Sequence, residues 1–143
     1  MSSICLMDTS VFLNILSVPS RNQDRVLVLR DFETYVEAGC TFILPMAVIL
    51  ETGNHIAQNG DGTTRRKTAE RFVLEVKNAF TGIAPWRLSQ FPNTADILLW
   101  IDRFPDLAGK NKAPDKLEGT SFGDLSIIDE FDSAKPTLPR TTM

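Results

Sequence analysis

Three acidic residues stand where carboxylates could work together, although the chain separates them widely. Asp8 directly follows the apolar run Ile4–Met7, Glu51 lies in the helical pattern after Pro45, and Asp124 opens a late apolar segment. Sites built from a few carboxylates suit Mg²⁺ or Mn²⁺, which bind oxygen ligands and retain several waters. Such ions activate water and stabilise charge at a transferring phosphoryl group. If the three side chains converge, the sequence predicts metal-assisted hydrolysis of a phosphate ester.

Asp8 and Asp124 also have structural explanations. Asp8, or one of the two residues after it, could cap the helix that follows. The stretch Ser121-Phe-Gly-Asp124 fits a capping box, and negative charge is favoured at a helix N-terminus. On a helical wheel Asp124 lies near the centre of the apolar stripe, whereas Asp129 and Glu130 point toward solvent. A carboxylate on an inward face needs a donor, a cation or a metal, so capping and a site role both remain open.

Glu51 gives a weaker signal from periodicity. The predicted helix places it opposite the side that carries Ile49 and Ile56, next to Asn54 and His55. Periodicity by itself therefore favours a solvent-facing Glu51, with His55 one turn on, over a site role. His55 is the only histidine, and a lone histidine without cysteine or histidine partners gives no support for a zinc site.

The elements that must position these residues alternate along the chain. Apolar runs predict buried strands at 4–7 and 41–44, and helical patterns cover 11–16, 23–38, the segment from Pro45, 64–80, 95–104 and 122–132. Residues 81–93 and 105–119 are expected to be connections. This alternation predicts an α/β fold with a parallel sheet covered by helices, in which sites gather beyond the carboxyl ends of the strands.

Length and composition bound the remaining possibilities. A chain of 143 residues is most simply one domain, and its net charge of -3 gives no global attraction to nucleic acid. Cys5 and Cys40 lie in apolar stretches, which suits reduced, buried thiols in a cytoplasmic protein. The N-terminal apolar run is too short for a membrane span. Any contact with nucleic acid would need a local basic patch.

Such patches occur in two places. Arg65, Arg66 and Lys67 open a basic amphipathic helix, and Lys110, Lys112 and Lys116 lie in the polar connection. Either set could be a solvated surface, or could hold phosphates near a metal.

The three acidic residues lie in short motifs: Asp8 in Leu-Met-Asp-Thr-Ser-Val-Phe, Glu51 in Leu-Pro-Met-Ala-Val-Ile-Leu-Glu and Asp124 in Asp-Leu-Ser-Ile-Ile. The order and spacing of these motifs resemble those of the PIN-domain ribonucleases, including the toxins of bacterial toxin–antitoxin pairs. The resemblance covers residues 3–132 of a single domain spanning 1–143. It implies a three-layer α/β/α sandwich with a central parallel sheet. It also implies that the three acidic residues are catalytic and hold Mg²⁺ or Mn²⁺ for RNA phosphodiester hydrolysis. Ser10 or Asn14 would assist near Asp8, and an inhibitory antitoxin protein would accompany the activity. Separately from the resemblance, Trp100 shares a helical face with Asp96 and Phe104, so this helix could serve a homodimer or partner contact.

One departure from that family concerns the C-terminal end. The family usually has a further strand after the helix of Asp124, with a fourth acidic residue near its end. Here residues 133–143 contain two prolines and no acidic residue, so the last strand is expected to be missing or the site uses three carboxylates. Asp96, Asp129 and Asp132 are the other acidic candidates.

Two alternatives compete with the nuclease. A haloacid-dehalogenase phosphatase also begins with a strand and an aspartate, but Asp8-Thr-Ser10 lacks the second aspartate of that motif. The stronger alternative is a non-catalytic RNA-binding or scaffolding module with an incomplete acidic site. Metal-dependent cleavage that is lost with Asp124 would separate it from the nuclease.

Overall fold

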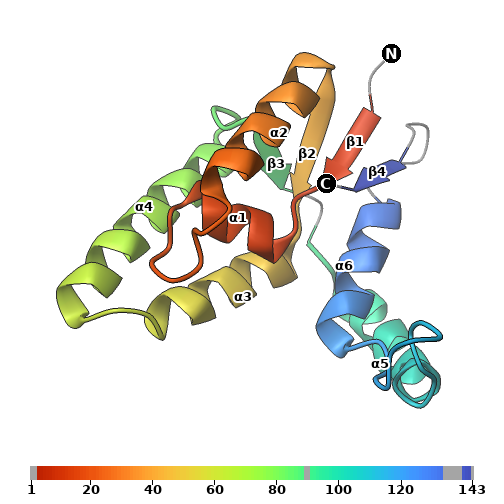
Figure 1. Cartoon of the computed structure of the whole chain (residues 1–143). Coiled ribbons are helices and arrows are strands. Elements are labelled where there is room, and N and C mark those ends of the chain that lie inside the picture. Colours follow the sequence, from red (N-terminus) through yellow and green to blue (C-terminus); the bar gives the residue numbers. More distant parts are fainter. Residues whose placement is uncertain (1–2, 89–90, 134–139, 143) are drawn as a thin grey trace.

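The fold is built on a parallel sheet. The structure, a computed structural model, describes residues 3–88, 91–133 and 140–142. Its strands are β1 (Ser3–Leu6), β2 (Cys40–Leu44), β3 (Trp86–Leu88) and β4 (Arg140–Thr142), and they lie in the order β3-β2-β1-β4 (Figure 1). All three strand pairings are parallel. The predicted α/β class with a parallel sheet is thus confirmed.

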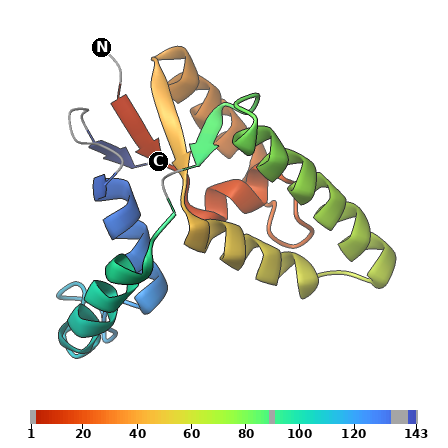
Figure 2. The same cartoon turned by 180° about the vertical axis from the view of Figure 1, so that it is seen from behind.

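Helices connect the strands, as the alternating pattern predicts. They are α1 (Thr9–Ile15), α2 (Arg25–Glu37), α3 (Met46–Ala57), α4 (Gly62–Phe80), α5 (Thr94–Ala108) and α6 (Phe122–Ser133). Seen from either side, α1 to α4 lie together next to β2 and β3, whereas α6 lies apart from them below β4, and α5 lies beside α6 on the side away from the sheet (Figures 1 and 2). The molecule therefore has a larger helical part and a smaller one.

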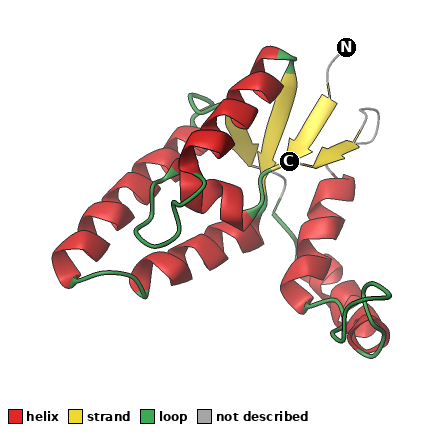
Figure 3. Cartoon of the chain, in the orientation of Figure 1, coloured by secondary structure: helices red, strands yellow, loops and turns green. Residues whose placement is uncertain are grey.

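The sheet separates two apolar cores, because successive side chains of a strand point to opposite faces. Cys5, Met7 and Phe42 belong to the larger core, which α1 to α4 complete. Ile4 and Ile43, the alternate residues, pack instead against Phe131 of α6. Helices therefore cover both faces of the sheet, which is compatible with the predicted three-layer sandwich (Figure 3).

Two strands lie where the sequence analysis expected none. β3 falls within the predicted connection 81–93, where Trp86 is buried and packs edge-on against Phe12 with ring centroids 5.6 Å apart. Gly82 and Pro85 before these three residues and Pro92 after them hide the strand from periodicity. β4 pairs with β1 in register Cys5↔Thr141, so the expectation of a missing last strand is wrong. None of the three β4 residues is acidic.

Helix boundaries follow local chemistry. Gly39 adopts a φ of 88° directly after the last turn of α2, the left-handed conformation that glycine adopts freely. The Asp61 carboxylate accepts a hydrogen bond from the Thr64 N–H (2.8 Å) at the start of α4, which lowers the pKa of Asp61. α5 runs through Pro105 to Ala108, four residues beyond the prediction.

The thiols partly match the prediction. Cys5 and Cys40 are both free, but only Cys5 is buried. Burial, followed by the neighbouring Cys40 thiol, raises the pKa of Cys5 to about 12, so it stays protonated at neutral pH. Across the described ranges, the structure has no helix with the length and apolar character needed to cross a membrane.

The strand order reverses at β1, and this positions the site. From β1 the chain builds β2 and β3 on one side, and β4 is added on the other side. In open α/β sheets a crevice opens beyond the carboxyl ends of the strands at such a reversal, and ligands bind there. Asp8 follows the carboxyl end of β1 by two residues.

Candidate acidic site at the carboxyl end of the sheet

A hollow of about 590 Å³ lies beyond the end of β1, and all three predicted carboxylates line it. They come from separate elements: Asp8 precedes α1, Glu51 lies within α3, and Asp124 lies in the first turn of α6. We call this cavity the acidic hollow. Its other lining residues are Leu6, Thr9, Lys112, Ala113, Lys116, Thr120, Ile127 and Ile128.

Asp8 both caps a helix and faces the acidic hollow. Its Oδ1 accepts hydrogen bonds from the Ser10 N–H (3.0 Å) and the Ser10 hydroxyl (3.5 Å), so it is the N-cap of α1. The residue is nevertheless exposed, and it lines the hollow. The two interpretations of the sequence are therefore compatible, since one oxygen can satisfy the helix while the carboxylate remains accessible.

Glu51 is half-buried and does not face open solvent, contrary to the solvent-facing alternative. Its Oε2 accepts a hydrogen bond from the Thr9 hydroxyl (2.7 Å). On its other side Gly123 of α6 is so close that a Cβ at that position would lie 3.1 Å from Glu51 Oε1. At Glu51, α1 and α6 enclose the side of α3 that the sequence pattern predicts to be polar, whereas Asn54 on the same side is exposed.

Asp124 lies in the predicted first turn of α6, but not on an inward face. Its N–H donates to the Ser121 hydroxyl (3.0 Å), as the capping-box pattern predicts. The residue is exposed together with Ile128, one turn later, which the wheel had placed in the core. The inward face of α6 instead carries two polar residues, Ser126 and Glu130. The apolar stripe is therefore right for Leu125 and Phe131, which are buried, and wrong for Asp124 and Ile128.

Glu130 is a structural residue that the sequence analysis placed in solvent. It is only 3% exposed, and its Oε2 accepts a hydrogen bond from the Met46 N–H (3.1 Å) at the first residue of α3. The N-cap of α3 is Pro45, whose side chain makes no capping hydrogen bond, so α6 supplies the acceptor from outside. The sequence indicates the need for such an outside acceptor only indirectly, because the helix begins at a proline and has no Ser, Thr, Asp or Asn to cap it.

The basic residues of the acidic hollow come from the loop before α6. Lys112 and Lys116 line it, as two of the three alternative candidates in the polar connection. Arg65, Arg66 and Lys67 do not line it. They lie at the start of α4, at the end of the molecule opposite α5 and α6 (Figure 1).

The predicted RNA-binding residues of α4 have local interactions. Arg65 donates to the Gly60 carbonyl oxygen, and Arg66 forms an exposed ion pair with Glu70 (3.2 Å). Lys67 is exposed. In this arrangement the three side chains form a solvated helix face that is distant from the carboxylates.

The structure does not place the candidates for a fourth acidic residue in the acidic hollow. Asp96 and Asp129 line a separate cavity of about 190 Å³. Asp96 closes a capping box with Asn93 at the start of α5 (2.9 and 3.0 Å), and Asp132 is exposed on α6. Ser10 contacts Asp8 as expected, and the buried amide of Asn14 bonds instead to the Ser10 carbonyl oxygen.

The donor set of the acidic hollow has the right chemistry for a hard cation, because it consists of carboxylate and hydroxyl oxygens. The side chains do not yet surround a common point. Within residues 3–88, 91–133 and 140–142, no group of three or more His, Cys, Asp or Glu side chains is arranged to hold a metal ion. Asp8, Glu51 and Asp124 would have to approach one another, or share ions through water.

No protein-family model matches the sequence, and neither the curated proteins nor the solved structures contain a match.

Proposed function

We propose that this chain is a PIN-like, metal-dependent endoribonuclease that hydrolyses RNA phosphodiester bonds. The observation that carries the proposal is the position of Asp8, Glu51 and Asp124. These residues are 43 and 73 positions apart in the sequence, yet all three line one cavity at the carboxyl end of the sheet. The predicted order of acidic residues therefore corresponds to one place in the fold.

In this proposal each side chain has a defined role. Asp8, Glu51 and Asp124 would hold Mg²⁺ or Mn²⁺, which supplies an activated water and stabilises charge on the phosphate. Thr9 fixes the orientation of Glu51 through its hydroxyl. Lys112 and Lys116 place ammonium groups at the same cavity, where they would attract the RNA backbone. The chain needs no nucleophilic side chain.

The deciding experiment is cleavage of single-stranded RNA by the purified chain with Mn²⁺, with Mg²⁺ and with EDTA. A circular RNA substrate in parallel detects internal cleavage, since it has no ends for an exonuclease. We expect metal-dependent cleavage that Asp8→Asn and Asp124→Asn each reduce by on the order of 100-fold or more. Asp115→Asn is the matched control, because Asp115 is an exposed acidic residue that does not line the acidic hollow.

A second candidate function is a non-catalytic RNA-binding or scaffolding module. It is favoured by Lys112 and Lys116, which line the hollow and supply positive charge from the chain itself, so that RNA could be held there without a metal ion. Under this alternative, RNA binds equally well with metal and with EDTA, and no cleavage occurs. An intact, folded protein that binds but never cuts would replace the nuclease with this module.

Partner binding is part of the same proposal. Four large apolar side chains of α5 are 38 to 62% exposed, namely Ile97, Leu98, Leu99 and Ile101. A homodimer contact or an inhibitory protein would bury such side chains, and interfaces favour apolar residues at their centres.

A further inference from the structure

The loop at residues 109–121, which we call the lysine loop, is fixed in position by its own backbone. The Lys112 N–H donates to the Glu118 carbonyl oxygen (2.9 Å), and the Thr120 N–H donates to the Leu107 carbonyl oxygen (3.1 Å). Gly119 packs so tightly on α5 that a Cβ there would overlap the backbone of Ala108. The loop therefore presents its lysines at a defined place.

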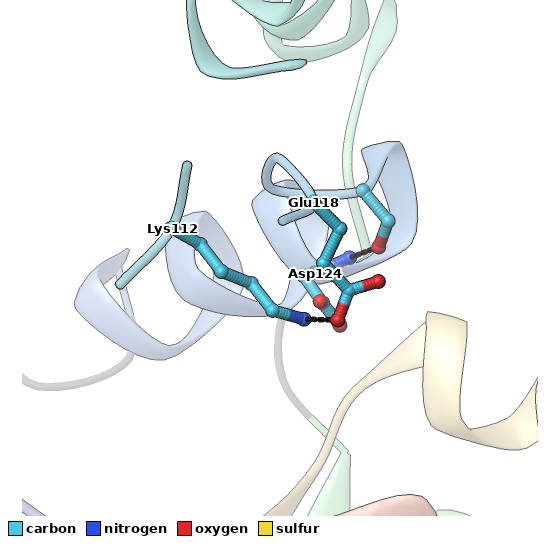
Figure 4. A network of polar contacts seen from close by, with 4 residues as sticks. Lys112, Glu118 and Asp124 are labelled. Carbon is cyan, nitrogen blue, oxygen red and sulfur yellow. Dashed lines mark hydrogen bonds and ion pairs between the residues drawn. The ribbon is translucent and has the colours of Figure 1, made fainter. Parts of the chain in front are cut away.

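Lys112 lies near two carboxylates, Asp124, which lines the acidic hollow, and Glu118, which does not. Its Nζ is 2.9 Å from Glu118 Oε1, and Asp124 of the acidic hollow lies beside this pair (Figure 4). The hydrogen bond to Glu118 raises the pKa of Lys112, and the charge of Asp124 acts in the same direction. Glu118 does not line the acidic hollow, whereas Lys112 does. One ammonium group thus interacts both with a carboxylate of the hollow and with one outside it.

The acidic hollow is lined by charges of both signs. Three carboxylates and two ammonium groups line the acidic hollow. A divalent ion entering there would meet repulsion from Lys112 as well as attraction from Asp124, since like charges at these distances oppose each other even in a watery site. The position of the ammonium group therefore affects how strongly the hollow holds an ion.

We infer that Lys112 is a tethered counter-ion of the acidic hollow, which opposes entry of a divalent cation, and that Glu118 holds the ammonium group away from the carboxylates. The inference rests on the proposed function, because it requires the hollow to accept a divalent ion. It adds a regulatory pair of residues to that site. Glu118 acts through Lys112 and is a positioning residue.

The first test measures Mn²⁺ binding to the full-length chain by isothermal titration calorimetry at low ionic strength, without RNA. Lys112→Met removes the charge and keeps a long unbranched side chain. We expect it to tighten Mn²⁺ binding about three- to tenfold, and to lose most of that gain at high salt. Lys110→Met, in the same loop but outside the hollow, should bind Mn²⁺ like the unaltered chain.

The second test uses Glu118→Gln, which should have the opposite effect. Without Glu118 the ammonium group is free to pair with Asp124, so Mn²⁺ binding should weaken about threefold or more. Asp115→Asn controls for the loss of any negative charge from the loop. In the double variant Lys112→Met with Glu118→Gln, the effect of the glutamine should disappear, because Glu118 acts only through the lysine.

The outcomes separate this inference from the proposed function. Mn²⁺ binding that is equal in the unaltered chain and in Lys112→Met would overturn the counter-ion while leaving the metal site intact. A persistent effect of Glu118→Gln in the Lys112→Met background would show that Glu118 acts on the ion directly. If no variant binds Mn²⁺, both the inference and the metal-dependent nuclease fail. Circular dichroism and thermal unfolding of each variant exclude misfolding as the cause of a change.

Discussion

At the scale of single residues, the carboxylate of Glu51 is confined from two directions. The Thr9 hydroxyl donates to one oxygen at 2.7 Å, and the backbone of Gly123 approaches the other. Because Gly123 has no side chain, α6 can bring Asp124 close to α3 without pressing on Glu51. The glycine is therefore required by a neighbour's side chain, whereas a helix by itself would favour alanine at that position.

This close approach predicts that Gly123→Ala separates function from stability. The new methyl group would lie 3.1 Å from Glu51 Oε1, so the carboxylate would have to shift by a few tenths of an ångström. We expect Mn²⁺ binding and RNA cleavage to fall at least about tenfold, whereas the free energy of unfolding changes by less than about 1 kcal/mol because alanine favours the helix. Calorimetry, cleavage and urea denaturation measure the three quantities.

Gly53→Ala is the matched control, since Gly53 also lies within a helix and its new Cβ would be 3.9 Å from the ring of Phe72. That distance is an ordinary contact, so the control should keep Mn²⁺ binding. Equal loss of binding in both variants would mean that Gly123 has no special relation to Glu51.

Residue types alone predicted part of this site. Asp8 could be selected because it follows the end of a strand, where α/β folds gather polar groups, whereas Glu51 lies within a helix and is predicted only through the resemblance to the PIN-domain ribonucleases. Lys112 could not be selected from the lysines of its loop, since an irregular loop has no periodicity that fixes the direction of a side chain. The helical wheel predicts an inward face for Asp124, whereas the buried acidic residue of α6 is Glu130, whose hydrogen-bond partner, the Met46 N–H, lies 84 positions away in the sequence.

At the scale of elements, the hydrogen bond from the Met46 N–H to Glu130 joins α3 to α6. Glu130 accepts from the first N–H of α3, where the helix dipole favours a negative charge. Glu51 lies on α3 and Asp124 on α6, so the same contact fixes the helices that carry two of the three carboxylates. Periodicity could not predict it, because it depends on how two helices meet across the end of the sheet.

We therefore expect Glu130→Ala to lower the free energy of unfolding by about 2–3 kcal/mol, since it leaves a helix N-terminus without its acceptor in a buried place. Glu130→Gln keeps an acceptor and loses only the charge, so its cost should be about 1 kcal/mol. Urea denaturation compares the two. Asp129→Ala, at the neighbouring and less buried position, should change stability by less than about 0.5 kcal/mol. A cost for Glu130→Ala as small as that of Asp129→Ala would refute the role of the contact.

At the scale of the whole molecule, the two faces of the sheet are unequally supported. Trp86 lies in the larger core, where its ring packs against Phe12 and Phe32. Trp100 of α5 packs on the other side against Phe122 of α6, with ring centroids 6.4 Å apart. Most neighbouring apolar residues of α5 are exposed. Regions with few buried apolar contacts open at lower free energy than the main core, so the part that carries Asp124 and the lysine loop should be the less stable one.

The two tryptophans, one in each part, allow this difference to be measured. Trp86→Phe leaves Trp100 as the reporter, and Trp100→Phe leaves Trp86. During urea unfolding of the first variant, we expect the fluorescence midpoint to precede the far-ultraviolet circular dichroism midpoint by roughly 1 M, because α5 and α6 open first. In the second variant the fluorescence midpoint should coincide with the dichroism midpoint or follow it. Coincident midpoints in both variants would instead describe one cooperative unit. A separate opening of α5 and α6 would move Asp124 away from Asp8 and Glu51, so occupation of the acidic hollow by Mn²⁺ should bring the two midpoints together.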